Sequence, residues 1–424
     1  MISRRSFLAL SLTLAACSST GQLGALLRPP GRKRPRYFIS TPSSYWKKQD
    51  LSVLEPMSKT LRLPGIAAPD LRGDQPFTIL TAVNDDGTDL HRVLIPLAYH
   101  CVANSPEAGV VYLMGNHRPS ALLALDAEDL EVANLVLAPQ AGDERTFGGH
   151  GVAVDGHFAY TMNGNKKGFY DSISIRDPST LREVQSYSTY GFQAHEIRLS
   201  PDKKYFVCGH YGSYLGQGPY KGMGIYGGDG SYGMNRSPEF VYPSSVTMVE
   251  VSSGKRFRAL SDVKSGQEGH ADSDEHYNAY LPNVPAKIHS RKNIEKHPRF
   301  QEGEYTKPDR KEFAVTDNSL GISLAYDRKF GEVIVPDRGS PRLLITDSKL
   351  FRQRELDFGE QTKALPWLKV EGDFVSGLDF HPDGKHYILS TSAGFAAFER
   401  GTHRLNPAMS FPLPLLVHSH LCII

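Results

Sequence analysis

Three histidines occupy similar places in repeating stretches of the chain, and imidazole is among the commonest metal ligands in proteins. Each stands ten residues before a tyrosine: His150 before Tyr160, His195 before Tyr205 and His270 before Tyr280. His150 and His195 are 45 residues apart, which is the length of one blade of a β-propeller. Successive blades are related by rotation about a central axis, so the repeat predicts that the three imidazoles converge there. Imidazole suits iron, copper, zinc and haem iron, and the pattern therefore predicts a metal centre.

Further side chains near these positions are candidates for the same centre. His100 begins an earlier blade and is a fourth candidate metal ligand, although it is two residues out of register. Carboxylates beside ligating histidines commonly fix the ring tautomer, and the acids expected in that role are Glu196, Asp272 and Glu275. The alternative is a wet channel in which the histidines have a structural role. His210 is expected to be solvated or to lie in a turn.

Motifs of other catalytic classes are missing from the sequence. It contains no Gly-x-Ser-x-Gly nucleophile motif, no His-Glu-x-x-His zinc motif, no phosphate-binding loop and no EF-hand. A calcium-dependent propeller hydrolase needs oxygen ligands on the axis, whereas the predicted axial positions are rich in histidine. The first hypothesis is therefore a protein without catalytic activity that binds a metal ion or metal complex, or docks proteins of metal uptake, through this funnel. A propeller oxidoreductase, a lactonase-like hydrolase and a pure interaction scaffold are the alternatives.

The elements that position these residues are short apolar runs separated by polar turns, which fill the chain from about Tyr37 with almost no helical periodicity. This pattern predicts an all-β fold, a single β-propeller over residues 41–424, with seven blades preferred and six as the alternative. The stretch Phe77–Arg92 is expected to pair with strands from the C-terminus, because closing the ring removes the open sheet edge between the first and last blades. Two segments, 211–242 and 286–310, interrupt the repeat and are expected to be loop insertions.

Residues 1–16 have the features of an export signal peptide. Arg4 and Arg5 form a twin-arginine motif, an apolar core too short to span a membrane follows, and small residues precede Cys17. The sequence therefore predicts export to the periplasm by the twin-arginine route, cleavage before Cys17 and lipidation of that cysteine, with a lipidated tether over residues 17–40. The alternative is an ordinary secretory peptide cleaved nearby. The mature protein is expected to be a periplasmic lipoprotein, held at the membrane by its lipid anchor.

The net charge limits the classes of partner, and the cysteine spacing limits the zinc sites and disulfides that the chain can form. The formal net charge is +2 and becomes 0 once Arg4 and Arg5 leave with the signal. A chain so balanced offers no basic footprint, so nucleic acid is excluded as a partner. Cys101, Cys208 and Cys422 are widely spaced and form no zinc motif. A disulfide between two of them and buried free thiols both remain open.

Three phrases carry a resemblance to a known family: FGGHGVAVDG, AHEIRLSPDKKYFVCG and PSSVTMVEVSSGK. They resemble the bacterial "domain of unknown function 1513" family, which has a GHG, a PHE and a Met-x-Pro-Ser-Leu element in this order. By this resemblance His150 matches the first element and His195 with Glu196 matches the second, although Ala194 replaces the proline. His270 corresponds to an Arg-His-Leu element that here reads Gly-His-Ala.

The resemblance covers residues 90–400 and implies a fold, a location and partners. Members of the family are exported propellers similar to the seven-bladed quinoprotein amine dehydrogenase-like and YVTN-like folds. They tend to occur beside imelysin-type and di-haem proteins of periplasmic iron uptake. The resemblance thus implies metal-uptake proteins as partners, and a transition metal (iron or copper) or haem iron is the expected cofactor.

Overall fold

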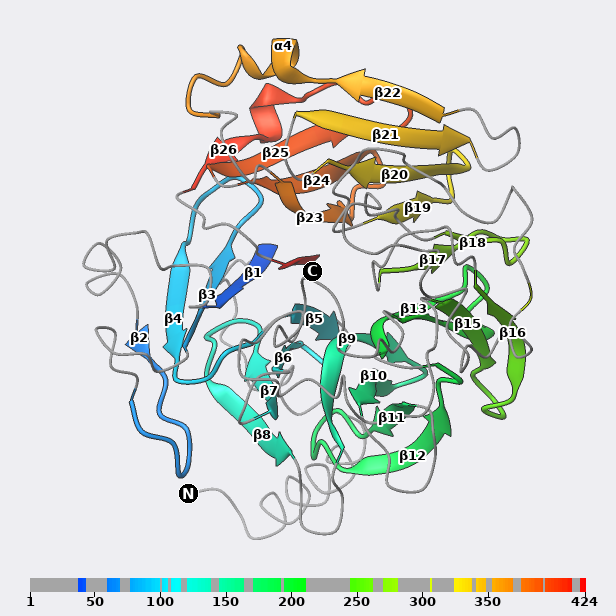
Figure 1. The fold of residues 1–424 in the computed structure, drawn as a ribbon. Helices are drawn as coiled ribbons and strands as arrows, with labels where there is room; N and C mark the ends of the chain where they lie inside the picture. The colour runs from blue at the N-terminus through cyan, green and yellow to red at the C-terminus, as the bar shows by residue number, and fades with distance from the viewer. Residues whose placement is uncertain are drawn as a thin grey trace, which may run out of the picture.

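In the computed structural model the regular secondary structure of the described residues is almost all β-strand, and the sheets surround a central axis (Figure 1). It describes residues 37–42, 59–68, 77–99, 101–105, 108–115, 120–138, 145–163, 171–191, 194–210, 245–261, 270–280, 306, 324–337, 341–347, 353–368, 375–391, 393–413 and 420–424. The helices in this part of the chain are short, α4 (Gly359–Thr362) and η4 (Pro407–Met409). None of the described helices is long and apolar enough to cross a membrane.

Five sheets have four antiparallel strands that follow one another in sequence order across the sheet. The first three sheets comprise β5 (Cys101–Ser105), β6 (Val110–Gly115), β7 (Ser120–Asp126) and β8 (Val132–Ala138); β9 (Thr146–Val154), β10 (His157–Asn163), β11 (Ser172–Arg176) and β12 (Glu183–Ser188); and β13 (Ala194–Leu199), β14 (Tyr205–His210), β15 (Ser245–Glu250) and β16 (Arg256–Leu260). The other two comprise β19 (Ala325–Asp327), β20 (Glu332–Pro336), β21 (Arg342–Asp347) and β22 (Gln353–Asp357); and β23 (Val375–Phe380), β24 (His386–Thr391), β25 (Gly394–Glu399) and β26 (Phe411–Pro412). The first strand of each sheet lies nearest the centre of the ring (Figure 1).

Strands from both ends of the chain close the ring in a sixth sheet, with the order β2-β4-β3-β1-β27. Its strands are β1 (Tyr37–Pro42), β2 (Lys59–Thr60), β3 (Thr78–Val83), β4 (His91–Ile95) and β27 (His420–Ile423). β1 pairs antiparallel with β27 on one side and with β3 on the other. The predicted pairing of the 77–92 region with the C-terminus is confirmed in outline, with β1 inserted between the two. β27 is consequently the innermost strand of this blade, as Figure 1 shows by the C-terminus at the centre.

The described residues form six complete blades, so the preferred number of seven is corrected to the alternative of six. A seventh sheet contains only the two strands β17 (Asp272–Ser273) and β18 (Ala279–Tyr280). This hairpin packs between the β13–β16 and β19–β22 blades, because Ala279 belongs to an apolar cluster with Val246 and Tyr280 to one with Val333. The repeat around His270 therefore builds the hairpin, but the described chain adds no outer strands to it.

The core is a ring of apolar layers between neighbouring sheets. Leu80 and Val93 pack with Val111 and Leu123 across one such interface, and equivalent clusters fill the others. Central strands are covered on both faces, so they read as continuous apolar runs; β7 (SALLALD) is buried along its first six residues. Rim strands face water, so β12 (EVQSYS) is polar and partly exposed. The all-β propeller prediction is confirmed.

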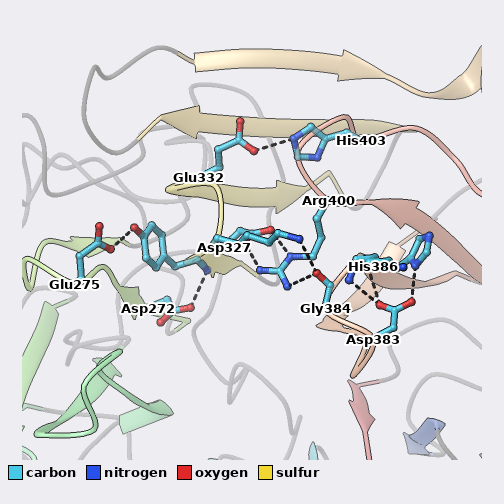
Figure 2. A network of polar contacts seen from close by, with 12 residues as sticks. Asp272, Glu275, Asp327, Glu332, Asp383, Gly384, His386, Arg400 and His403 are labelled. Carbon is cyan, nitrogen blue, oxygen red and sulfur yellow. Dashed lines mark hydrogen bonds and ion pairs between the residues drawn. The ribbon is translucent and has the colours of Figure 1, made fainter.

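Polar pairs also join blades, as Figure 2 shows for β19–β22 and β23–β26. Arg400 binds both carboxylate oxygens of Asp327, whose side chain has no exposed surface. His403 Nε2 lies 3.0 Å from Glu332 Oε2 in the same interface.

The structure can be compared with some of the predicted domain limits. β1 begins at Tyr37, so the propeller starts before residue 41 and the expected tether, 17–40, overlaps its first strand. The signal at 1–16 and the insertion at 211–242 lie outside the described residues, as does the insertion at 286–310 except for Thr306, whose backbone forms an isolated bridge with Leu260.

Candidate metal centre

His150, His195 and His270 meet on the axis, each from a different sheet. His150 lies in β9, His195 in β13, and His270 two residues before β17. The ring centroids are 4.8 Å apart for His150 and His195, 4.9 Å for His150 and His270, and 4.8 Å for His195 and His270. One ligand atom from each residue lies within 4.8 Å of the other two, and all three residues are buried. Rotation of the repeat therefore brings like side chains together in the way the sequence predicted.

β-Bulges direct two of these imidazoles toward the axis. His150 lies in the stretch 148–150 of β9, where pairing with β10 shifts register. His195 is the extra residue of a bulge in β13, between Ala194 and Glu196. A bulged residue leaves the strict alternation of the strand, so its side chain is re-aimed, and bulges are common beside functional sites.

The ten-residue spacing to tyrosine reflects a different register in each blade. Tyr160 pairs with Gly151, next to His150, whereas Tyr205 lies at the turn end of its hairpin, where its carbonyl accepts a hydrogen bond from the Ser200 backbone. The spacing therefore identifies three histidines that meet, although the tyrosines are not equivalent. The feature that the two histidines share is the bulge.

Gly149 allows the close packing of these rings. A Cβ atom at this position would lie 2.1 Å from Nδ1 of His195, which is far inside any real contact distance. The backbone of β9 thus runs directly against the imidazole presented by β13, and only glycine permits this approach.

Glu196 connects two of the three imidazoles. Its Oε2 lies 2.5 Å from His270 Nδ1, and its Oε1 lies 3.4 Å from His150 Nδ1. Burial favours the protonated acid, but Arg198 and the hydrogen bond to His270 outweigh that effect, so the pKa of Glu196 is lowered. The side chain is therefore a carboxylate that holds two rings by the same nitrogen, as the sequence analysis expected for this position.

The carboxylates around the centre outnumber the basic groups that pair with them. Arg198 Nε donates to Glu196 Oε1 at 3.2 Å, and its Nη1 lies 3.6 Å from Asp272 Oδ2. Burial raises the pKa of Asp272 although Arg198 opposes the shift. Burial also raises the pKa of Asp379 in β23 to about 6, against hydrogen bonds from the Phe380 and Ile423 backbones and the charge of Arg198. Three acids thus share one guanidinium.

His420 is a fourth imidazole at the centre, and the sequence analysis missed it. Its ring centroid lies 4.8 Å from that of His150 and 6.0 Å from that of His270. It begins β27, the closing strand, which has no blade repeat of its own. His420 could have been found from the predicted pairing of the C-terminus with the first blade. A closing strand that lies innermost presents its side chains to the axis.

Cys101 in β5 extends the group on the side of His420. Its Sγ lies 3.2 Å from His150 Nδ1, and Cys101, His150 and His420 each offer a ligand atom within 4.8 Å of the other two. Burial, followed by the negative charge of Glu196, raises the pKa of the Cys101 thiol well above its usual value. Cys101, Cys208 and Cys422 are free and buried, which answers the question between disulfide and thiol.

Burial holds two of the imidazoles neutral. It lowers the pKa of His195 well below the ordinary value, and His270 and His420 add to the shift. It also lowers the pKa of His420 to about 3, again with a contribution from His270. Neutral imidazole is the form that binds a metal ion.

The remaining predicted residues lie elsewhere. Glu275 is 45% exposed and accepts a hydrogen bond from the Tyr326 hydroxyl, so it is not part of the buried group (Figure 2). His210 is buried, with Nδ1 3.3 Å from the Ser245 carbonyl oxygen, and the expectation of a solvated or turn residue is wrong. His100 and Cys17 lie outside the described residues.

Comparison with known proteins supports the resemblance found in the sequence. Residues 93–212 match the family described as "Protein of unknown function (DUF1513)". The DUF1513 match includes Cys101, His150, His195 and Glu196, so the first half of the centre lies inside it. No curated protein matches the chain.

The similar solved structures are distant in sequence. A dihydro-haem d1 dehydrogenase NirN in complex with DHE shares 12% identity with a TM-score of 0.48, over 81% of this chain and 65% of that one. A 6-phosphogluconolactonase, described as putative, from Bacteroides fragilis shares 10% identity with a TM-score of 0.47, over 94% of this chain and 100% of that one. The chain thus spans slightly less than two thirds of the length of the dehydrogenase.

Proposed function

We propose that this protein is an exported propeller that binds one transition-metal ion, iron or copper, through the imidazoles of His150, His195 and His270. The observation that carries the proposal is the meeting of three buried imidazoles from three sheets, with ligand atoms within 4.8 Å of one another. Three imidazole nitrogens can hold one ion between them, and imidazole suits both metals.

Charge complementarity supports a cation at this position. The charges of Glu196, Asp272 and Asp379 all act on a single guanidinium, that of Arg198, and Glu196 contacts two of the imidazoles. Two carboxylates therefore have no matching positive charge among these four groups. A divalent cation bound to the three histidines would supply that charge, and anions would be repelled.

Glu196 also orients the ligands for this role. A carboxylate on Nδ1 of a ligating histidine fixes the tautomer and raises the basicity of the ring. Glu196 contacts Nδ1 of His270 at 2.5 Å and Nδ1 of His150 at 3.4 Å. The Nε2 atoms of these two rings would then be the metal ligands.

The donor set favours a transition-metal ion over calcium and over haem. Calcium takes six to eight oxygen ligands, whereas Glu196 and Asp272 are already engaged with Arg198. A haem macrocycle needs an open face beside its iron, and the ring centroids here are only 4.8–4.9 Å apart. Metal binding is accordingly proposed in preference to a calcium-dependent hydrolase.

The proposal places the protein in the periplasm as a lipoprotein that carries or delivers its metal to uptake proteins. It is supported by Arg4, Arg5 and the small residues before Cys17. Replacing Cys17 with alanine should release the protein from the membrane fraction into the soluble periplasm. Cytoplasmic accumulation of the natural chain would contradict the location.

Metal analysis of the purified protein tests the binding proposal. After loading with Fe(II) or Cu(II) and gel filtration, the natural chain should retain one ion. His150→Ala and His195→Ala should each lose it. His403→Ala is the matched control, because His403 is also a buried histidine beside a carboxylate but lies in a blade interface. Retention of the metal by both axial variants, or its loss in the control as well, would contradict the proposal.

A further inference from the structure

A second set of ligand atoms adjoins the three-histidine site. It consists of Cys101 from β5, His150 from β9 and His420 from β27, each with one ligand atom within 4.8 Å of the other two. The closest contact is 3.2 Å, between Cys101 Sγ and His150 Nδ1. These residues come from three different sheets, so the thiol reaches the axis by the same rotation as the histidines.

The two sets form two neighbouring positions. They share only His150, and the ring centroids of His270 and His420 are 6.0 Å apart, farther than any pair within the first set. One ion held by the first three histidines would therefore not reach Cys101 and His420 as well. His150 Nδ1 faces Cys101 at 3.2 Å and Glu196 at 3.4 Å, so it can bind the second ion in place of its contact with Glu196 while Nε2 serves the first position.

We propose that Cys101, His150 and His420 form a second metal position, which takes a soft monovalent ion, copper(I). This inference rests on the proposed function for the adjacent site, but it has its own ligands. Thiolate and imidazole together suit soft metals, and thiolate selects copper(I) over hard ions such as magnesium and calcium. The charge of one thiolate also neutralises one copper(I), which lowers the cost of burying the pair.

Binding involves no change of oxidation state. The S–H bond of Cys101 breaks, an S–Cu bond forms, and the thiol proton passes to the buffer. Copper enters and remains as copper(I), and His150 and His420 each donate a ring-nitrogen lone pair. When the first position is filled as well, His150 bridges the two ions as an imidazolate, and its remaining ring proton also passes to the buffer. The centre would then bind copper(I) at the second position and a divalent ion at the first, with the His150 ring between them.

The test uses two metal probes on the full chain under anaerobic conditions. Copper(I) is titrated against a chromophoric copper(I) chelator, and Co(II) is followed by its visible absorption. Cys101→Ser and His420→Ala should each weaken copper(I) binding more than about tenfold while leaving Co(II) binding unchanged. His195→Ala should do the reverse. Cys208→Ser, which changes a buried thiol in β14, is the control and should alter neither.

The outcomes separate this inference from the proposed function. Copper(I) affinity in Cys101→Ser equal to that of the natural chain would overturn the second position, even if Co(II) still bound to the three histidines. Failure of Co(II) to bind any variant, with copper(I) binding still dependent on Cys101, would overturn the proposed function alone. Chemical unfolding of each metal-free variant shows whether it is folded, and if Cys101→Ser is not, His420→Ala decides.

Discussion

The interface in Figure 2 and the axial centre both bury charged and imidazole side chains, but they pair them differently. In the interface each of these basic groups lies against an acid: Arg400 binds Asp327, and His403 lies 3.0 Å from Glu332, which also lies 3.7 Å from Arg354. On the axis four imidazoles gather, and Glu196 is shared between two of them. Pairs of opposite charge satisfy buried groups and join blades, whereas the axis gathers like imidazoles around one carboxylate.

The pKa shifts point to the same difference. Burial lowers the pKa of His195, and the nearby His270 and His420 lower it further, so protonation there is opposed by neighbours of the same kind. Such an arrangement adds little to stability by itself. It does provide neutral nitrogen ligands at neutral pH. Asp272 links the regions, because its Oδ2 accepts from the Tyr326 backbone while Arg198 lies 3.6 Å away.

The largest predicted effect is a loss of folding stability from a substitution in the blade interface, which leaves the axial centre unchanged. Asp327→Ala leaves the buried Arg400 without its carboxylate, and breaking such a pair costs about 3–5 kcal/mol. The free energy of unfolding, measured in denaturant, should fall by that amount while the metal content of the folded protein is unchanged. Replacing Arg400 with methionine in the same chain should restore much of the loss. A loss below about 1 kcal/mol would show that the pair does not hold the blades together.

Two glycine substitutions distinguish the effect of steric crowding on stability from the loss of a metal ligand. Gly149→Ala would place a Cβ atom 2.1 Å from His195 Nδ1, and Gly191→Ala would place one 2.4 Å from Cδ2 of His210. Each overpacked site should cost about 1–3 kcal/mol of unfolding free energy. Only Gly149→Ala should also lose the bound metal, because it displaces a ligand ring. Equal metal content in the two variants would contradict the role of His195.

Glu196→Gln tests the shared carboxylate. The amide keeps the shape of the side chain but removes the charge that orients His270 and His150, and loss of such a partner typically lowers metal affinity about 10–100-fold. Calorimetric titration of the metal-free protein measures the change. Glu332→Gln, which alters the carboxylate beside His403, is the control. The axial role of Glu196 is disproved if both changes leave the affinity unaltered.

The smallest predicted effect is a pH dependence from Asp379. Its folded-state pKa, about 6, lies above the unfolded value, so the folded chain binds the proton more tightly. The stability contribution of the protonated acid is present below the folded pKa and is lost as the pH rises through it, with a loss on the order of 1 kcal/mol for this partly buried group. Unfolding free energies between pH 4 and 7 should fall more steeply in the natural chain than in Asp379→Asn. Parallel curves would contradict the shift.

Much of the fold could be predicted from the sequence because the blade pattern is local. Continuous apolar runs such as that of β7 mark central strands, and closure by both termini follows from the need to remove sheet edges. The blade number could not be predicted, since the repeat around His270 reads like any other yet builds only a hairpin in the described chain. Counting repeat phrases does not count outer strands.

The site was predictable only where it follows the repeat. His150, His195 and His270 belong to repeating phrases, and rotation places them together. His420 reaches the axis through the pairing of β27 with β1, two strands distant in sequence, which no spacing rule encodes. Cys101 lies in the first strand of an earlier blade but is not part of the histidine repeat. The bulge at His195 could not be predicted from the sequence either, because register shifts depend on the partner strand.

Anomalous diffraction from crystals of the metal-loaded protein, collected at the absorption edge of the metal, tests the central claim most directly. The account predicts a peak on the axis within bonding distance of ring nitrogens of His150, His195 and His270. A fully loaded protein whose peak lies away from these rings, or whose axis holds only water among them, would contradict it.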